Sequence, residues 1–369
     1  MIRQRNLQVT AVAHDYFTQR GGAERVAAAL VDHFRPPVVL TAAHESANTF
    51  AMWAPGEMKT SFIQRIPSLR KDPRRALPLL PLAWALMPPV TSGVLICSSS
   101  GWAHSARASG TAVKVVYCHN PARWLYQPDD FWRGGSAILR VAVAAISPFL
   151  RRWDRAAAAS AHLYIANSQA VAQRIKDTYS RECLVIPPPV TLNADGPRTQ
   201  VTGLPEDFFV TVSRARAYKN TERLFEAFAL APNANLVVVG NRPDRANIPD
   251  NVYFTGRVHD DELRWIYRRA RALVSISSED FGLTPLEANA QGTPALVIRA
   301  GGFLDSLDDG ISGQYLDEDE PAYIADRLGA FPRNWDEDAL RHHAASFSLA
   351  SFTAKLTAAI EVATARASE

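Results

Sequence analysis

The sequence predicts an α/β protein built from two doubly wound parallel sheets, one in each half of the chain. Short apolar runs alternate with helical patterns through both halves, which is typical of parallel sheets with crossover helices. The 369 residues are enough for two domains that each bury a core. Residues 187–205 are rich in Pro, Gly, Asn and Thr, have no apolar periodicity, and are the expected linker.

The N-terminal half is expected to form one domain over residues 1–190. Its apolar runs have the length and composition of buried parallel strands. Strands are expected at residues 9–13, 38–41, 93–97, 113–118, 164–167 and 183–186, and helices at residues 23–33, 138–161 and 170–179.

The C-terminal half repeats this alternation, and its domain is expected over residues 205–349. The sequence then ends with a strong helical pattern at residues 350–367. Strands of this half are expected at residues 208–212, 236–239, 252–254, 272–277, 295–298 and 314–316, with helices between them, for example at residues 221–229 and 260–269.

The stretch SSEDFGLTPLEANAQG in the C-terminal half has the pattern of a strand end, a short loop and a capped helix. Thr284 is the expected N-cap, Pro285 the first helical residue, Glu287 the capping-box carboxylate, and Gly292 the end of the helix. Backbone N–H groups of the loop would converge at the helix N-terminus and favour an anion. Because Glu279 and Glu287 flank this loop, the stretch suits a ligand with both hydroxyls and phosphates, such as a nucleotide-sugar.

This stretch resembles the E-x7-E signature of the family-4 retaining glycosyltransferases, which have the GT-B fold. Further segments resemble motifs of that family in the same order, so that the resemblance covers nearly the whole chain; they are HDYFTQRGGAER, VVYCHNPARWLY, NSQAVAQRI and VSRARAYKN. The histidine-containing segment is similar to that of bacterial mannosyltransferase-like members. The resemblance implies two Rossmann-like domains with a cleft between them. It also implies that the C-terminal helix, residues 350–369, crosses back to the N-terminal domain.

Two carboxylates and the loop between them are expected to bind the donor. Glu279 would hold hydroxyls of the transferred sugar, as a catalytic residue, although a solvated loop acid is the simpler alternative. Glu287 would accept hydrogen bonds from the ribose, as the resemblance implies, or serve only as a helix cap. The backbone N–H groups of Phe281, Gly282 and Leu283 are expected close to the donor.

Arg214 and Lys219 follow the first strand of the second domain, and we expect both to be catalytic. Two cations on such a loop suit a diphosphate. The alternative is a solvated basic loop, which is a sufficient explanation for Arg216 between them. Breaking a sugar–diphosphate bond leaves charge on the distal phosphate, so cations that bind the transition state more strongly than the ground state accelerate the step.

Other donor contacts are expected at strand ends. A lone histidine such as His119 is more often structural, but the resemblance implies that it lines the donor sugar near the anomeric carbon and is catalytic. Gly21 and Gly22 open a helix, where glycine often serves only packing, and would let the backbone approach the phosphate. Arg257 or the main chain of Val258 would border the base and ribose.

The acceptor side is expected at the end of the first strand, where His14, Asp15 and Tyr16 follow one another. A carboxylate such as Asp15 resembles a general base. A retaining reaction requires no such base, because the leaving phosphate can take the proton of the acceptor. These residues are therefore expected to position the acceptor.

Composition limits the function classes. A net charge of +3 argues against a dedicated nucleic-acid binder. The three cysteines, Cys97, Cys118 and Cys183, have no metal-site spacing and indicate reduced thiols in a cytoplasmic protein. The first residues lack an apolar signal stretch. No Asp-x-Asp motif is seen in the expected cleft loops, so we expect neither a metal nor another cofactor.

One segment predicts a possible peripheral contact with the inner face of a membrane. Residues 65–75 are basic and residues 76–86 are apolar, although a partly exposed helix with one buried face explains the pattern equally well.

The predicted activity is transfer of a hexosyl group from a nucleotide-sugar to a hydroxyl of a glycan, a lipid-linked saccharide or a small glycoside. Mannosyl from GDP-mannose is the preferred donor, on the similarity of the histidine loop. A sugar-nucleotide epimerase of the same fold and a non-catalytic bilobal nucleotide-sugar-binding protein are the alternatives. A dinucleotide-dependent oxidoreductase is disfavoured, because no G-x-G-x-x-G follows the first strand of either domain.

Overall fold

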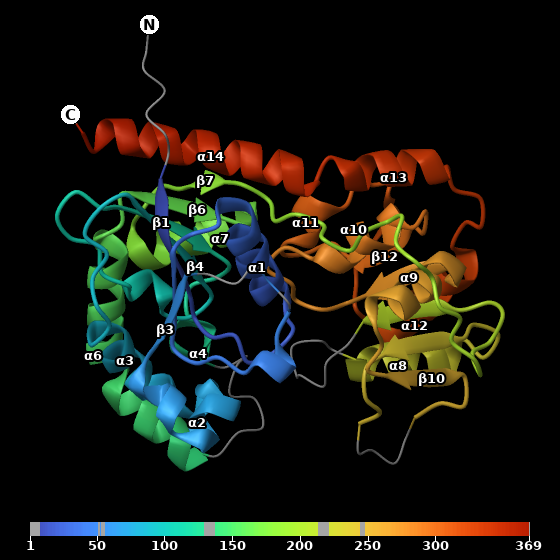
Figure 1. The fold of residues 1–369 in the computed structure, drawn as a ribbon. Helices are drawn as coiled ribbons and strands as arrows, with labels where there is room; N and C mark the ends of the chain where they lie inside the picture. The colour runs from blue at the N-terminus through green and yellow to red at the C-terminus, as the bar shows by residue number, and fades with distance from the viewer. Residues whose placement is uncertain are drawn as a thin grey trace, which may run out of the picture. The chain divides into compact units, whose positions relative to one another are not determined.

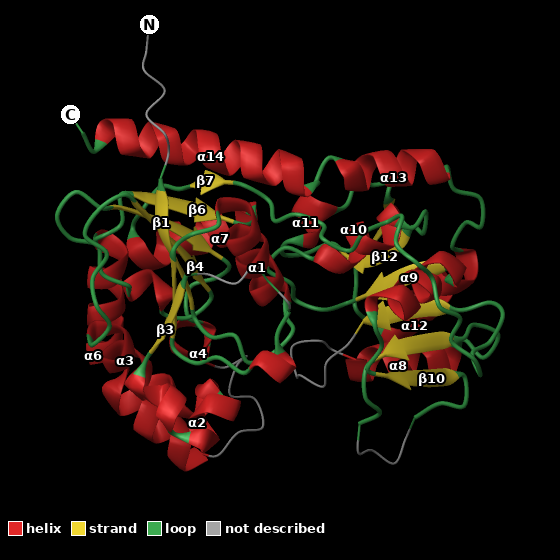
Figure 2. Ribbon diagram, viewed as in Figure 1, coloured by secondary structure: helices red, strands yellow, loops and turns green. Residues whose placement is uncertain are grey.

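The protein divides into two compact units, each with one parallel sheet between layers of helices (Figures 1 and 2). Unit 1 comprises Met1–Pro188 with Leu349–Glu369, and unit 2 comprises Pro189–Ser348. The computed structural model describes residues 8–50, 52, 56–128, 137–212, 221–243 and 248–368. The predicted α/β class with two doubly wound parallel sheets is confirmed.

Unit 1 contains seven parallel strands in the order β3-β2-β1-β4-β5-β6-β7. The expected strands are present within a few residues, whereas edge strand β3 was not predicted. Its sequence EMKT is exposed or half-buried and therefore lacks an apolar signal. The strands are β1 (Val9–His14), β2 (Val38–Thr41), β3 (Glu57–Thr60), β4 (Val94–Ser99), β5 (Val113–Cys118), β6 (Leu163–Ala166) and β7 (Leu184–Val185).

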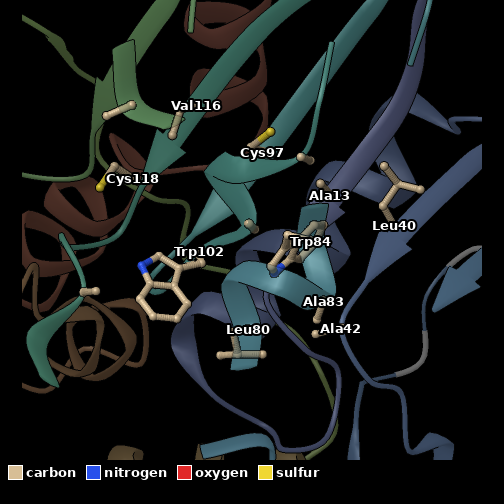
Figure 3. Packing of buried hydrophobic residues seen from close by; sticks show 14 of the residues in the cluster. Ala13, Leu40, Ala42, Leu80, Ala83, Trp84, Cys97, Trp102, Val116 and Cys118 are labelled. Carbon is tan, nitrogen blue, oxygen red and sulfur yellow. The ribbon is translucent and has the colours of Figure 1, made fainter. Parts of the chain in front are cut away.

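Helices cover both faces of this sheet, because successive strand residues point to opposite sides. On one face, β-strand side chains such as Val12 and Tyr117 pack against α1 and α14. The other face packs against α3, α6 and α7, and Figure 3 shows Trp84 and Trp102 near Cys97 of β4. The helices are α1 (Gly22–Phe34), α2 (Pro67–Lys71), α3 (Leu80–Ala85), α4 (Arg123–Tyr126), α6 (Ala137–Ala159), α7 (Gln169–Tyr179) and α14 (Leu349–Arg366).

Helix α14 lies on unit 1 although it follows unit 2 in the sequence. Phe352, Leu356 and Ile360 recur every four residues and are buried against the sheet. The Phe352 ring meets that of Tyr117 edge-on, with centroids 5.5 Å apart. The C-terminal helix therefore crosses back to the N-terminal unit, as the resemblance implied.

Unit 2 contains six parallel strands in the order β10-β9-β8-β11-β12-β13. Adjacent residues of β8 enter different cores: Phe209 packs with α8 and α12, and Val210 packs with α9 and α10. The strands are β8 (Phe209–Val212), β9 (Leu236–Val239), β10 (Val252–Gly256), β11 (Ala272–Ser275), β12 (Ala295–Ile298) and β13 (Gly313–Leu316), and the helices are α8 (Thr221–Leu230), α9 (Asp260–Arg269), α10 (Leu283–Ala290), α11 (Phe303–Ser306), α12 (Pro321–Ala330) and α13 (Glu337–Ala345).

Most of the expected linker is packed on unit 2. Leu192 is 3% exposed in the core of that unit, and Arg264 donates from Nε to the carbonyl oxygen of Pro197 at 2.8 Å. Arg198 donates to Gln291 Oε1 at 3.0 Å. The linker predicted at 187–205 was therefore too long. The segment has no periodic apolar pattern, but polar contacts with residues distant in the sequence hold it on unit 2.

The strand orders place a switch point in each sheet. The chain runs outward in one direction from β1 and in the other from β4, and likewise from β8 and β11. In open parallel sheets, ligands bind beyond the carboxyl ends of the strands at such points. The loops after β1, β4, β8 and β11 are therefore the candidates for function.

Candidate functional site

At the switch point of unit 1, two histidines share one serine. His14 ends β1, Ser98 lies near the end of β4, and His119 directly follows β5. His14 Nδ1 lies 3.0 Å from the carbonyl oxygen and 3.1 Å from the hydroxyl of Ser98. The same hydroxyl lies 2.8 Å from His119 Nε2. The sequence predicted both histidines but not Ser98, which is one of three consecutive serines.

The hydrogen bonds determine the tautomers. A carbonyl oxygen only accepts, so His14 donates through Nδ1–H, and the Ser98 hydroxyl is left to donate to His119 Nε2. Burial, and then the nearby His14, lower the pKa of His119 to about 3, so His119 is neutral at physiological pH. His14 Nε2, on the other side of the ring, has no hydrogen-bond partner within the described residues.

Asp15 organises the adjacent loop. Its Oδ2 accepts from the N–H and hydroxyl of Ser100 at 2.6 and 3.0 Å, and its Oδ1 accepts from the N–H groups of Trp102 and Ala103 at 2.8 and 2.6 Å. The side chain is buried. Because four donors already hydrogen-bond to this carboxylate, Asp15 shapes the loop after β4. That it positions the acceptor stays a prediction.

A buried polar cluster anchors helix α4, which carries the segment just after His119. Tyr126 donates from its hydroxyl to Asp154 Oδ2 at 2.8 Å, and Asp154 Oδ1 lies 3.0 Å from His104 Nε2. Asp154 and His104 are almost fully buried. Burial, and then the charge of Asp154, raise the pKa of Tyr126 far above its usual value, so the hydroxyl remains a donor. Sequence patterns gave no sign of this cluster, since its members lie far apart in the chain.

Gly21 and Gly22 lie where the sequence expected them. Gly21 is the N-cap of α1, with φ −123° and ψ 173°, and Gly22 is the first helical residue and is exposed. The backbone of Gly21 is extended, so no positive φ requires glycine there. Tyr16, two residues after β1, is half-buried.

In unit 2, the loop after β11 carries Glu279. Ser275 and Ser277 have hydroxyls 2.8 Å apart, and Ser277 donates to Glu279 Oε1 at 2.9 Å. Glu279 is half-buried, and its carbonyl oxygen accepts from the N–H of Gly302 at 3.0 Å. The carboxylate is thus oriented by a local chain of hydroxyls.

The loop after β12 supports this Glu279 loop from one side. A Cβ on Gly302 would lie 2.2 Å from Phe281 Cα and 2.3 Å from the carbonyl oxygen of Asp280. A Cβ on Gly301 would lie 2.7 Å from the carbonyl oxygen of Glu279, and Gly301 has φ +59°. The two backbones therefore approach so closely that only glycine fits.

The start of α10 differs from the prediction. Gly282 is the N-cap, with φ +86°, and the helix begins at Leu283, so Thr284 is not the cap and Pro285 is not the first residue. A Cβ on Gly282 would lie 2.5 Å from Phe303 Cδ1, and this contact with a distant residue sets the helix start. Gly292, with φ +80°, follows the end of the helix as predicted.

The amides at this helix start are available for a ligand. The N–H groups of Phe281, Gly282 and Leu283 have no acceptor among the residues that the structure describes. They precede the helix or lie at its first position, where N–H groups lack intrahelical partners and favour an anion.

Glu287 does not form the expected capping box. It lies on α10, is 9% exposed, and its Oε2 accepts from the hydroxyl of Tyr267 on α9 at 3.1 Å. Tyr267 is fully buried and was not identified from the sequence. The prediction failed because the helix starts two residues earlier than expected, which leaves a different residue at the capping-box position.

The two expected phosphate-binding cations lie outside the described residues. Arg214 and Lys219 fall within 213–220, just after β8 ends at Val212. β8 itself pairs directly with β11, the strand that leads to Glu279. Arg257 is exposed and Val258 is half-buried after β10, the edge strand on the far side of β9.

Comparison with known proteins finds a family model that is similar to much of the second unit. Residues 198–345 match the family described as Glycosyl transferases group 1. The match includes Glu279, Glu287 and the segment with Arg214 and Lys219, and it supports the glycosyltransferase resemblance over these residues.

Relatives support the family but not a mannosyltransferase. The D-inositol 3-phosphate glycosyltransferase of Geodermatophilus obscurus is 32% identical over 242 residues, which are 55% of this chain and 54% of that protein. The same enzyme of Streptomyces coelicolor is 39% identical over 127 residues, or 32% of this chain and 28% of that protein. The chain thus spans about half the length, or less, of these relatives. They are not mannosyltransferases by name, so the finer resemblance is not supported.

Solved structures show the fold of the whole chain. Sucrose-phosphate synthase from Thermosynechococcus elongatus matches with a TM-score of 0.69 at 17% identity, over 97% of this chain and 100% of that one. HepE of Anabaena, solved in complex with UDP-glucose, matches with a TM-score of 0.66 at 16% identity, over 95% of this chain and 99% of that one. The predicted GT-B fold is therefore confirmed.

Proposed function

We propose that the chain is a retaining glycosyltransferase that moves a hexosyl group from a nucleotide-sugar to a hydroxyl of a glycan, a lipid-linked saccharide or a small glycoside. The observation that carries the proposal is the loop after β11. It combines an oriented carboxylate, Glu279, with three available amides and a second carboxylate, Glu287, at the switch point of a group 1 family unit.

In this proposal, unit 2 binds the donor. The amides of Phe281, Gly282 and Leu283 and the cations Arg214 and Lys219 bind the diphosphate, Glu279 holds the sugar, and Glu287 holds the ribose. The Glu287 carboxylate already accepts a hydrogen bond from the Tyr267 hydroxyl, and this hydrogen bond fixes its orientation. Arg257 and Val258 contact the base and ribose. The family match over these residues supports the assignment.

Unit 1 supplies the acceptor side and part of the donor contacts. His14 Nε2 is a buried ring nitrogen that has no partner within the described part of the chain, and a hydroxyl of the acceptor is suited to form a hydrogen bond with it. His119, kept neutral by burial, lines the transferred sugar. Tyr16 completes the acceptor side, Asp15 positions the loop, and Gly21 and Gly22 let the start of α1 approach the phosphate.

The proposed chemistry needs no protein base. The bond between the anomeric carbon and the distal phosphate oxygen breaks, and a bond from the acceptor oxygen forms on the same face of the sugar. The acceptor proton passes to the leaving phosphate. Arg214 and Lys219 stabilise the charge that develops on this phosphate, and removing one such donor typically costs about 3–4 kcal/mol of barrier stabilisation.

The donor and acceptor are the finer part of the proposal. GDP-mannose is the first donor to test, from the similarity of the histidine loop. UDP-glucose is the second, since HepE was solved in complex with it. Inositol phosphates join glycans and lipid-linked saccharides among the acceptors to test, because of the names of the relatives.

The test is a thermal-shift screen of the full chain against GDP-, UDP-, ADP- and dTDP-sugars, followed by mass spectrometry of reactions with the best donor. A donor should raise the melting temperature by mass action, and an acceptor-dependent glycoside should form. Conversion of the donor alone to its epimer would favour the epimerase, and stabilisation without any turnover would favour a binding protein.

A further inference from the structure

Three leucines form an exposed stripe on unit 1. Leu79, Leu82 and Leu86 are 45%, 52% and 67% exposed. They are spaced three and four residues apart along η3 (Pro73–Leu79) and α3, so they lie on one side of this helical run. The opposite side is buried in the core through residues such as Leu80 and Trp84. We call Leu79, Leu82 and Leu86 the leucine stripe. It faces solvent because the opposite side of the helical run is buried.

The neighbouring helix also carries exposed apolar side chains. Helix α6 packs beside α3 in unit 1 (Figure 1), and its Phe149 and Ile146 are 70% and 40% exposed. Twelve large apolar side chains are exposed in the described part of the chain, and half of them lie in residues 66–86 and on α6. Such clustering marks an interaction surface, whereas single exposed apolar residues are ordinary.

Positive charge borders the stripe. Residues 62–90 contain five basic residues and one acid, Asp72. The side chains of Arg65, Lys71 and Arg75 are exposed, and Arg75 lies 3.8 Å from Asp72. The surface is therefore apolar along one helical run and cationic at its beginning, which is the pattern of an element that lies in a lipid interface.

A second copy of the chain fits this surface less well. In a two-fold symmetric pair the same patch meets itself, so the basic borders would oppose each other, and the cores of protein interfaces are depleted of charge. An anionic membrane complements both the leucines and the cations. No helix in the part of the chain that the structure describes is long and apolar enough to cross a bilayer.

We propose that the leucine stripe and the basic residues before it dock unit 1 on the surface of a membrane that contains anionic lipid. The leucines enter the boundary between headgroups and acyl chains, and Arg65, Lys71 and Arg75 meet the anionic headgroups. The sequence predicted a possible contact for this segment, and the structure identifies the side chains that make it. The inference does not depend on the proposed transfer reaction.

The experiment is flotation of the full chain with phosphatidylcholine vesicles, with and without phosphatidylglycerol. Wild type should float only with the anionic vesicles, and less at high salt, because salt screens the charges. Leu82→Gln with Leu86→Gln should reduce binding at least tenfold. The matched control changes two leucines of unit 2 with similar exposure, Leu230→Gln with Leu304→Gln, and should bind as wild type.

Two further measurements keep the result decisive. Lys71→Glu with Arg75→Glu leaves the leucines intact and should also abolish binding to anionic vesicles. Light scattering with size-exclusion chromatography reports the oligomeric state of each variant. The proposal would be overturned if wild type does not float or if all variants float equally. It would also be overturned by a dimer that only Leu82→Gln with Leu86→Gln dissociates, because a second copy would then cover the leucine stripe.

Discussion

Gly302→Ala tests how the loop after β12 supports the Glu279 loop. Gly302 has φ −72°, which any residue adopts, so alanine meets no backbone strain there. Its Cβ would nevertheless lie 2.2 Å from Phe281 Cα and 2.3 Å from the carbonyl oxygen of Asp280. Both neighbours are backbone atoms, which cannot rotate away as a side chain does. The substitution must therefore move one loop relative to the other.

The size of the effect follows from these distances. Carbon atoms in contact are normally about 3.5–4.0 Å apart, so the loops must separate by roughly 1.5 Å. Overpacking of this kind costs about 1–3 kcal/mol, and we expect the upper end because backbone is displaced. A loss of about 3 kcal/mol lowers the melting temperature by roughly 6–12 °C in a domain of this size. A displacement of about 1 Å beside a reacting group can reduce turnover roughly 100-fold.

The assay combines thermal unfolding with turnover of the donor found by screening. Gly329→Ala is the matched control, since Gly329 lies within α12 and its Cβ would meet nothing within 4 Å. Alanine is favoured in a helix, so this control should stabilise unit 2 by up to about 1 kcal/mol and leave turnover unchanged. If Gly302→Ala unfolds and turns over like wild type, the close approach of the two loops is wrong.

Four further outcomes are expected. The pKa of His119 is about 3 in the folded state, against 6.5 for an unperturbed histidine of the unfolded chain, so the unfolded state binds more protons between these values. The free energy of unfolding should therefore fall as pH drops from 6.5 toward 3, by up to about 5 kcal/mol. His119→Gln should flatten this part of a plot of the urea midpoint against pH. A plot parallel to that of wild type would contradict the low pKa of His119. Tyr126→Phe removes the donor to Asp154 Oδ2 and should cost about 1–3 kcal/mol in urea unfolding, whereas no loss would show that the hydroxyl is dispensable. Tyr267→Phe removes the donor to Glu287 and should raise KM for the nucleotide-sugar more than it lowers kcat; the reverse pattern would argue against ribose binding. Turnover should persist in EDTA, and loss that magnesium restores would show that a metal is required.

Strands and the longer helices could be predicted because their signals are local. The buried runs at β2, β5, β9 and β12 were located to the residue, and a helix at 260–269 matches α9. Each carries its apolar pattern within a few residues. Edge strand β3 was missed, since a strand that buries no complete face has no such pattern.

Much of the candidate site could not be predicted, because its geometry depends on contacts between distant residues. The start of α10 is set by Gly282 against Phe303, and the orientation of Glu287 by Tyr267 on another helix. Asp15 looks like an acceptor-side acid in the sequence, yet its donors come from a loop more than 80 residues away. The sequence indicated which polar residues follow the strand ends. Their hydrogen-bond partners became evident only from the structure.

Calorimetric titration of a nucleoside diphosphate tests the central claim most directly. Wild type and the double variant Arg214→Ala with Lys219→Ala are compared, using the base found by donor screening. A hydrogen bond to a charged group contributes about 1.5–3 kcal/mol, so loss of both cations should weaken binding at least about 100-fold. Equal affinity of the two proteins, or no binding of any nucleoside diphosphate to wild type, would contradict the claim that unit 2 holds the donor by its diphosphate.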